Sequence, residues 1–519
     1  MICKNLVWSV LSASIAIASA ASTASAADAL SLQTRSRAPV DGADGQFKIV
    51  YKTVHWAPEK TAIIVCDMWA RHWCDGACDR GSQLAPRMNR FVTEARKRGV
   101  LIVHAPSSGM KHYADHPARK RATDAPKAGN VPKGMGGWAG LLPHEKKEDW
   151  PIDQSDGGCD DQPKCPSRPM DVHQTAAIEI LDEDAISDSG VECWNLFEQR
   201  GIDNVILLGV HTNMCVIGRP FGLRSMVRVG KNVLLVRDLT DTMYNSRSEP
   251  QVSHVRGTEL IVEYIEKHVC PTIASTALLP GPAVRFKEDR RPHVAMIVSD
   301  DHYDADKTLP AFAQMLRERY GLHCTVHHGE GKSDFPAMDD LPDADVMVLF
   351  IRRLALPEKQ LATVRKYLDS GKPLVGLRTA SHAFDVKGNA PEGCAEWRDF
   401  DPQVLGGSYH GHGSNTTGTD VALVRGPGGH PIIDGIEPAK WHSKGSLYFA
   451  APIDKAATLL MNGTSDGKTE PLTWTRSYKN ARVFYSSLGH PDDFGQKPFR
   501  TMLVNALFWA MDRPVPEVN

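Results

Sequence analysis

One cysteine and one aspartate in the first half of the chain each follow a short apolar run. Cys215 stands in the octapeptide Gly209–Val216, directly after the β-branched run at 204–208. Such a run predicts a buried parallel strand, and the turn after it predicts a helix that begins at Cys215. A thiol at a helix N-terminus has a lowered pKa, because backbone N–H groups and the helix dipole stabilise the thiolate. Cys215 is therefore a candidate nucleophile, and the alternative is a buried structural cysteine.

Asp67 stands in an equivalent position on another predicted strand. The apolar run at 61–66 ends directly before it. Open α/β sheets bind their ligands at the carboxyl ends of parallel strands, which is where both side chains would lie. Asp67 is therefore a candidate general base for Cys215.

The C-terminal half carries a second group of polar residues. They follow its predicted strands and turns: Asp300, Asp301, His302, Arg378, His382, His410, His412 and His490. If these side chains converge, they predict a polar site for a sugar or keto-sugar, or for a divalent cation. The alternative for each histidine is a hydrogen-bonded structural role.

Composition limits the function classes. The 519 residues suffice for more than one domain, and 60 basic against 62 acidic residues argue against nucleic-acid binding. Residues 1–26 combine Lys4, an apolar stretch and an Ala-Ser-Ala end, which predicts a cleaved signal peptide and a periplasmic or secreted bacterial protein. No later apolar run is long enough to span a bilayer.

An exported chain would meet oxidising conditions. The close pairs Cys74 with Cys78 and Cys159 with Cys165 lie in segments rich in Gly and Asp. The two pairs are far apart in the sequence and lack the spacing of a zinc motif, so disulfides are favoured over a metal site.

Strand and helix patterns alternate in two units, at 47–275 and 288–516, separated by a Pro-rich and charged linker at 276–287. The predicted fold class is α/β, with two doubly wound domains on mainly parallel sheets. A long aperiodic stretch at 107–171 predicts a lid or binding loop, in which His112, His116, Trp138 and the acidic run 153–161 could cover Cys215. A solvated insertion is the alternative.

The first unit resembles the isochorismatase-like cysteine hydrolases, which include nicotinamidases. The resemblance rests on Asp67, on the segment Val210–Cys215 and on a following strand at 233–238. It implies that Asp67 takes the proton of Cys215, that the thiolate attacks an amide-like carbonyl, and that water releases the thioester. It further implies a non-proline cis peptide at Val210–His211, which would turn the amides of His211 and Cys215 toward the oxyanion.

One position departs from that family. Its third catalytic residue is a lysine on the strand before the cysteine strand, and the matching stretch 176–183 contains Glu179 but no lysine. A carboxylate there would oppose thiolate formation. Either a distant residue such as Lys111 or Lys133 substitutes for the lysine, or the pocket has changed its chemistry.

The second unit resembles the ThuA-like family, a branch of the class I glutamine amidotransferase-like fold linked with sugar utilisation. The resemblance rests on the segments 375–384 and 487–494. True amidotransferases carry a cysteine at the strand-to-helix elbow, where this chain has Arg378, so the second unit cannot use their thiol mechanism.

Three functions therefore compete. The first is an exported cysteine hydrolase that acts on a small amide-like C–N substrate. If that substrate is linked to a carbohydrate, the ThuA-like domain would handle the sugar. The second is a non-catalytic carbohydrate-binding or scaffold protein, and the third is a sugar lyase or hydrolase with its chemistry in the ThuA-like domain. No cofactor is required, although a divalent metal in the ThuA-like domain is an open alternative. The expected partner is a small molecule, without nucleic acid or membrane span, and a homo-oligomer stays open.

Overall fold

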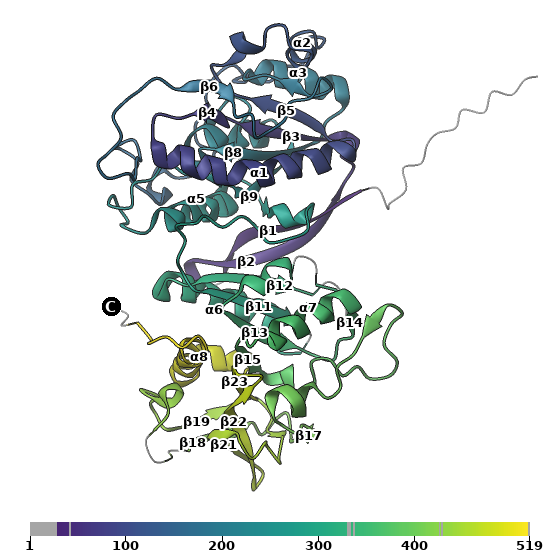
Figure 1. Cartoon of the computed structure of the whole chain (residues 1–519), viewed down its shortest axis with the longest axis vertical. Helices are drawn as coiled ribbons and strands as arrows, with labels where there is room; N and C mark the ends of the chain where they lie inside the picture. Colours follow the sequence, from purple (N-terminus) through teal and green to yellow (C-terminus); the bar gives the residue numbers. More distant parts are fainter. Residues whose placement is uncertain are drawn as a thin grey trace, which may run out of the picture.

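The computed structural model describes residues 29–40, 43–300, 302–329, 334–335, 338–424, 426 and 429–516. Two α/β domains lie one above the other along the long axis of the molecule (Figure 1). A long hairpin from the start of the chain lies between them, and its second strand contacts the second domain through α6 (Ala305–Tyr320). The predicted fold class is confirmed.

The first domain is built on an eight-stranded sheet, as far as the described residues show. Its central strands are parallel, and only the hairpin strands β1 and β2 run antiparallel to their neighbours. Every residue of β3, β5 and β8 is buried, as their apolar sequences predict. In spatial order the strands are β2 (Ala43–Trp56), β1 (Leu30–Val40), β10 (Thr272–Ile273), β9 (Asn232–Asp241), β8 (Asn204–Val210), β3 (Thr61–Cys66), β5 (Leu101–Ala105) and β7 (Ala185–Ile186).

Helices cover both faces of this sheet. One core contains α1 (Asp75–Lys97) with alternate residues of the strands. The opposite core contains α3 (Gly190–Arg200), α4 (Leu223–Arg228) and α5 (His254–His268) with the intervening strand residues. This is the doubly wound arrangement, and it brings the carboxyl ends of β3 and β8 together at one edge, since the two strands pair in parallel.

Three segments differ from the expectations. Residues 176–183 form no strand, because the edge position next to β5 is taken by the short β7. The segment 276–287 packs on the first domain through Leu278, Leu279 and Phe286, so it is a docked connection rather than a free linker. The first sheet also includes β1, which begins at Leu30 and thus before residue 47.

The second domain has a nine-stranded sheet within the described residues. One half is parallel, and the half from β22 onward is antiparallel, so this sheet is less uniformly parallel than its sequence predicts. In spatial order the strands are β12 (His323–His328), β11 (His293–Ser299), β13 (Val346–Ile351), β15 (Leu374–Leu377), β23 (Ala481–Ser486), β22 (Lys468–Tyr478), β21 (Thr458–Ser465), β18 (Thr419–Leu423) and β19 (Lys440–Ser443). Helices α6 and α8 (Lys497–Ala510) cover one face, and α7 (Glu358–Asp369) packs on the other.

Short pairs of strands complete the structure. The pair β4 (Trp69–Arg71) and β6 (Asp171–Gln174) fastens the end of the 107–171 insertion next to β3, and the insertion also contains α2 (Pro117–Thr123). The other pairs are β14 (Leu356–Pro357) with β16 (Cys394–Ala395) and β17 (Gly411–His412) with β20 (Tyr448–Phe449). Among the described helices, none has the length and apolar character needed to cross a membrane.

Candidate active site

Asp67 is the first residue after β3, and its backbone is held in an uncommon conformation. Its φ is 46°, in the left-handed region that non-glycine residues seldom occupy. The carboxylate is buried and accepts a hydrogen bond from the amide of Ser107 at 2.7 Å. The Asp67 amide in turn donates to the carbonyl of Ala105 at 3.1 Å, so the end of β5 holds Asp67 on both sides.

Cys215 reaches the same edge from β8. Gly209 makes this possible, because a Cβ at that residue would lie 2.0 Å from the carbonyl oxygen of Cys66. The following Val210–His211 peptide bond is cis, as the family resemblance implies. Cys215 then lies in a single π-helical turn, Thr212–Val216.

Side chains of the turn fasten it to β9 and to the segment after it. The Thr212 hydroxyl donates to the carbonyl of Asp241 at 2.9 Å. The Asn213 amide group forms two bonds with the backbone of Met243, at 2.9 and 3.0 Å. The segment around Cys215 is therefore a rigid support for the thiol, whose residue is 8% exposed.

The sequence prediction of a helix that begins at Cys215 is wrong, and so is the lowered pKa drawn from it. The π-helical turn is brief, and the next regular helix, α4, begins only at Leu223, after Gly218 and Pro220. Burial raises the pKa of Cys215 to about 12, and the neighbouring Asp67 carboxylate adds to this rise. The resting side chain is thus a thiol beside the Asp67 carboxylate.

Arg219, one helical turn beyond the cysteine, supplies a positive charge to this pair. Its Nη2 lies 3.4 Å from Oδ2 of Asp67, and its guanidinium also faces Cys215, whose pKa it lowers. Burial raises the pKa of the Asp67 carboxyl, whereas Arg219 and the hydrogen bonds from Cys215 and Ser107 oppose the rise. Sequence reasoning missed Arg219, although its i+4 spacing from Cys215 was a usable signal.

Glu179 does not join the pair. Its side chain is exposed, and its backbone bonds to Asn89 and Arg96 of α1. The expectation that a carboxylate occupies the place of the family lysine is therefore corrected: a cation, the Arg219 guanidinium, faces Cys215 together with Asp67.

The insertion covers part of the site through Trp138. The Arg219 guanidinium carbon lies 4.9 Å from the centre of the Trp138 ring, which is 57% exposed. His112 instead packs against His173, with ring centres 3.8 Å apart, and His116 caps α2 by accepting the amide hydrogen of Ala118. Of the three side chains expected to cover Cys215, Trp138 is the one that contacts the site's arginine.

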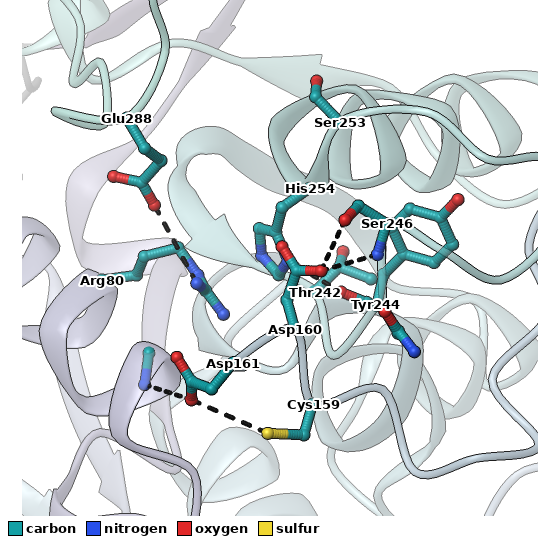
Figure 2. A network of polar contacts seen from close by, with 12 residues as sticks. Arg80, Cys159, Asp160, Asp161, Thr242, Tyr244, Ser246, Ser253, His254 and Glu288 are labelled. Carbon is teal, nitrogen blue, oxygen red and sulfur yellow. Dashed lines mark hydrogen bonds and ion pairs between the residues drawn. The ribbon is translucent and has the colours of Figure 1, made fainter. Parts of the chain in front are cut away.

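The acidic run of the insertion is used for attachment. Figure 2 shows the neighbouring residues Asp160 and Asp161 pointing to different partners. Asp160 accepts hydrogen bonds from the Ser246 amide at 2.8 Å and from its hydroxyl at 2.7 Å. Asp161 faces Cys159. The run thus ties the insertion to the segment after β9 and to the start of α1.

A cavity of about 70 Å³ lies beside Asp67 and is also lined by His72 and His211. The rings of the two histidines meet edge to face with centres 4.9 Å apart. Burial lowers the pKa of His211 to about 3 and that of His72 to about 4, so both rings are neutral at pH 7. A larger cavity of about 750 Å³ lies between the hairpin and the second domain, remote from this chemistry, with Tyr51, Arg237 and His327 in its lining.

In the second domain Arg378 occupies the elbow after β15, again with a φ of 46°. Its guanidinium is buried between the rings of Tyr303 and Tyr448, at 4.5 and 4.4 Å from their centres. It donates to the carbonyl oxygens of Ser446 and Ser487 at 3.2 and 2.6 Å. The elbow therefore carries a fixed cation.

Aromatic rings connect Arg378 to two of the predicted histidines. His382 stacks on Tyr409, with ring centres 4.5 Å apart, and lies 6.0 Å from Tyr448. His490 lies 6.4 Å from Tyr303 on the other side of the arginine. Burial lowers the pKa of His382 to about 3. The two histidines thus flank one aromatic cluster that contains Arg378, and the tyrosines are the members that sequence reasoning missed.

The remaining predicted residues lie at its margin or outside it. His410 is exposed and bonds to the carbonyl of Ser408 through Nδ1 at 2.8 Å. The His302 amide donates to Asp300, whose other carboxylate oxygen accepts from Thr379 at 3.0 Å beside the elbow. Asp301 lies outside the described residues.

The cysteine pairs differ from their prediction. Cys74, Cys78, Cys159 and Cys165 are all free, so neither expected disulfide is present. In the part of the chain that the structure describes, one group of potential metal ligands converges, and it lies in the first domain: Cys74, Cys159, Asp161 and Cys165. The metal expected in the second domain has no such group among the described residues.

Solved structures resemble each half of the chain, and no curated protein sequence matches it. A ThuA-like protein from Bacteroides uniformis ATCC 8492 is 19% identical, with a TM-score of 0.33, and the match covers 44% of this chain and 94% of that one. A cysteine hydrolase from Pseudomonas syringae pv. phaseolicola 1448A is 19% identical, with a TM-score of 0.27 and coverage of 43% and 92%. An isochorismatase family protein from Burkholderia thailandensis is 12% identical, with a TM-score of 0.23 and coverage of 42% and 94%.

A family model gives the clearest assignment. The model described as trehalose utilisation, ThuA, matches residues 294–510. This range begins within β11 and ends with α8, so it spans the sheet of the second domain from its first strand. The second domain therefore matches the ThuA family model over nearly its whole length, and it is called the ThuA domain below.

Proposed function

We propose that the first domain is a cysteine hydrolase that cleaves small amide-like C–N bonds. The observation that carries this proposal is that the buried Asp67 carboxylate and the Arg219 guanidinium, 3.4 Å apart, both lie beside the buried Cys215 thiol and shift its pKa. A buried thiol, a buried carboxylate and a cation in mutual contact are costly to assemble, and structural packing does not require them.

The pair supports a two-step mechanism. Asp67 takes the Cys215 proton as sulfur attacks the carbonyl carbon, and the backbone amides of His211 and Cys215 are the proposed donors to the oxyanion. Protonated Asp67 then gives its proton to the leaving nitrogen, which departs as an amine or ammonia. Water attacks the thioester with Asp67 as base, so the acid leaves and the thiol is restored.

Arg219 takes the electrostatic role that a lysine has in the resembling family. Its charge stabilises the thiolate as the proton moves to Asp67. Its Nε is buried without a hydrogen-bond partner among the described residues, so it can also donate to a substrate oxygen.

We further propose that the chain is exported and that the ThuA domain handles a sugar-derived part of the substrate. The trehalose-utilisation match supports the sugar, and the cluster of Arg378 with Tyr303 and Tyr448 offers aromatic faces and a cation. Two other functions compete: a non-catalytic carbohydrate-binding or scaffold protein, and sugar lyase or hydrolase chemistry in the ThuA domain.

The deciding experiment measures hydrolysis of a panel of small amides and sugar-linked amides by the wild type, Cys215→Ser and Asp67→Asn. We expect both variants to lose activity, because one lacks the thiol and the other lacks the base. Cys394→Ser, at a half-buried cysteine of the ThuA domain, is the control that keeps activity. Activity that survives in both site variants would place the chemistry in the ThuA domain. A wild type that is inactive on the whole panel would favour the binding protein.

A further inference from the structure

Four side chains from two distant segments converge beside the start of α1. The Sγ atoms of Cys74, Cys159 and Cys165 and one carboxylate oxygen of Asp161 all lie within 4.8 Å of one another. The oxygen Oδ2 of Asp161 lies 3.2 Å from Cys74, 3.7 Å from Cys159 and 3.1 Å from Cys165. Cys74 and Cys159 are fully buried.

These spacings suit a single tetrahedral ion. Zinc binds thiolate sulfur at about 2.3 Å and carboxylate oxygen at about 2.0 to 2.2 Å, so its ligand atoms lie roughly 4 Å apart. Three thiolates and one carboxylate fill four positions and leave none for water or substrate, which is the pattern of structural rather than catalytic zinc. Thiolate ligands also select zinc over magnesium or calcium.

Backbone N–H groups at the start of α1 are directed at the same atoms. The amide of Gly76 donates to Oδ2 of Asp161 at 2.9 Å, and the amide of Asp75 donates to Sγ of Cys165 at 3.4 Å. Four anionic ligands around a divalent ion leave excess negative charge, which these N–H groups and the positive end of a 23-residue helix offset. A Cβ at Gly76 would lie 2.8 Å from Asp161, so glycine permits the close approach.

The fourth nearby cysteine shows that proximity alone does not define the group. Cys78 lies one helical turn after Cys74, but its sulfur is 3.2 Å from the amide and 3.3 Å from the carbonyl of His72. It is therefore occupied elsewhere, which makes it a matched control from the same helix.

We propose that Cys74, Cys159, Asp161 and Cys165 bind a structural zinc ion. The ion would join the 107–171 insertion to α1, because one ligand comes from the start of that helix and three come from the insertion. Cys159 packs in one apolar cluster with Met243, whose backbone holds Asn213 of the cysteine turn. Loss of zinc would thus loosen the insertion next to Cys215 without removing any reacting group.

The test is the metal content of the full chain, purified without a histidine tag and measured by elemental mass spectrometry. We expect about one zinc per chain in the wild type and in Cys78→Ser, and a loss of at least about tenfold in Cys159→Ser and Cys165→Ser. A folded wild type without stoichiometric zinc, stoichiometric iron or copper in its place, or an equal loss in Cys78→Ser would each overturn the proposal.

Two measurements on the wild type cover variants that fail to fold. Exchange of zinc for cobalt should give a thiolate-to-cobalt absorption band, since sulfur ligands donate charge to the metal. Intact-mass analysis of the unreduced chain should show these cysteines as thiols once the metal is removed in acid. A loss of two hydrogens that maps to a bond among Cys74, Cys159 and Cys165 would contradict the site, because a disulfide cannot supply the thiolates.

Discussion

The two domains place very different groups at equivalent points of their sheets. Asp67 and Arg378 each follow a buried parallel strand directly, and each has a φ of 46°. In the first domain the strained residue is a carboxylate that contacts a thiol. In the second it is a guanidinium, 1% exposed, between two tyrosine rings.

The topology determines where each of these residues lies and how its backbone is held, whereas the side chain determines what chemistry is present there. Positive φ at a non-glycine residue costs roughly 1 to 3 kcal/mol and persists where the surroundings enforce it, so both elbows are positions that the fold holds in place. The first elbow lies beside a thiol, whereas the side chains that bond to the second elbow are the hydroxyls of Tyr303 and Ser446. The arginine of the second elbow donates its hydrogen bonds to Ser446, Ser487 and Tyr303 of its own domain, which predicts a role in stability or recognition rather than bond cleavage.

The largest expected effect is the loss of stability when the arginine of the second elbow is removed. Arg378→Ala should lower the free energy of unfolding of the ThuA domain by about 3 to 5 kcal/mol, because it leaves a cavity and two buried carbonyl oxygens without their donor. Urea unfolding followed by tryptophan fluorescence measures this change. Arg398→Ala, which removes an exposed pair with Glu396, should stay within about 1 kcal/mol of the wild type. An Arg378→Ala variant as stable as this control would mean that the cation is not structural.

The next effect tests the cation of the first elbow. Arg219→Ala should lower kcat/KM for amide hydrolysis by about 10² to 10³, the usual cost of removing a preorganised electrostatic group. Arg219→Lys should recover part of the rate, since charge is kept while the forked geometry is lost.

The alkylation rate of Cys215 separates the two possible roles of Arg219. The pKa of Cys215 should rise further in Arg219→Ala and move back in Arg219→Lys, because Arg219 lowers it in the wild type. A purely structural arginine would leave the pH profile of alkylation unchanged, and that result would count against the electrostatic role.

The two elbows also show how far sequence reasoning reached. Short apolar runs before Asp67, Cys215 and Arg378 identified β3, β8 and β15, because buried parallel strands require such runs. Arg219 was missed although it lies four residues after Cys215, because its contact with Asp67 joins residues 152 positions apart. The cysteine cluster was misjudged as disulfides for the same reason: Cys74 and Asp161 are 87 positions apart and meet only in the folded chain.

A buried carboxyl, Asp401, makes the stability of the ThuA domain depend on pH. Burial raises the pKa of Asp401 to about 6, against the opposing hydrogen bond from the Tyr409 amide. The folded state therefore binds this proton more tightly than the unfolded state does. The contribution of Asp401 to the free energy of unfolding is complete below the ordinary aspartate pKa of 3.8 and is lost as pH rises through about 6. Between about pH 5 and 8 the ThuA domain should lose roughly 1 to 2 kcal/mol from this group.

Asp401→Asn is the check on that slope. An amide cannot ionise, so the pH-dependent loss of stability between these values should shrink in the variant, as measured by urea unfolding at each pH. Asp454→Asn, at a carboxylate that pairs with Arg476, serves as the control and should keep the wild-type slope. An unchanged slope in Asp401→Asn would assign the pH dependence to other groups.

The smallest expected effect concerns Trp138, which reaches the first elbow from the insertion and not from the sheet. Trp138 comes from the insertion and places its ring 4.9 Å from the Arg219 guanidinium, and Gly218 allows this approach because a Cβ there would lie 2.8 Å from the ring. A cation–π contact at so exposed a position contributes about 0.5 to 1 kcal/mol, so Trp138→Ala should raise KM roughly two- to fivefold. The value of kcat should hold, since Asp67, Cys215 and Arg219 stay in place. Leu141→Ala, another exposed apolar residue of the insertion, should leave both constants unchanged. A fall in kcat with constant KM in Trp138→Ala would mean that the ring orients Arg219 for the chemical step, and the insertion would then belong to the catalytic elbow rather than to its cover.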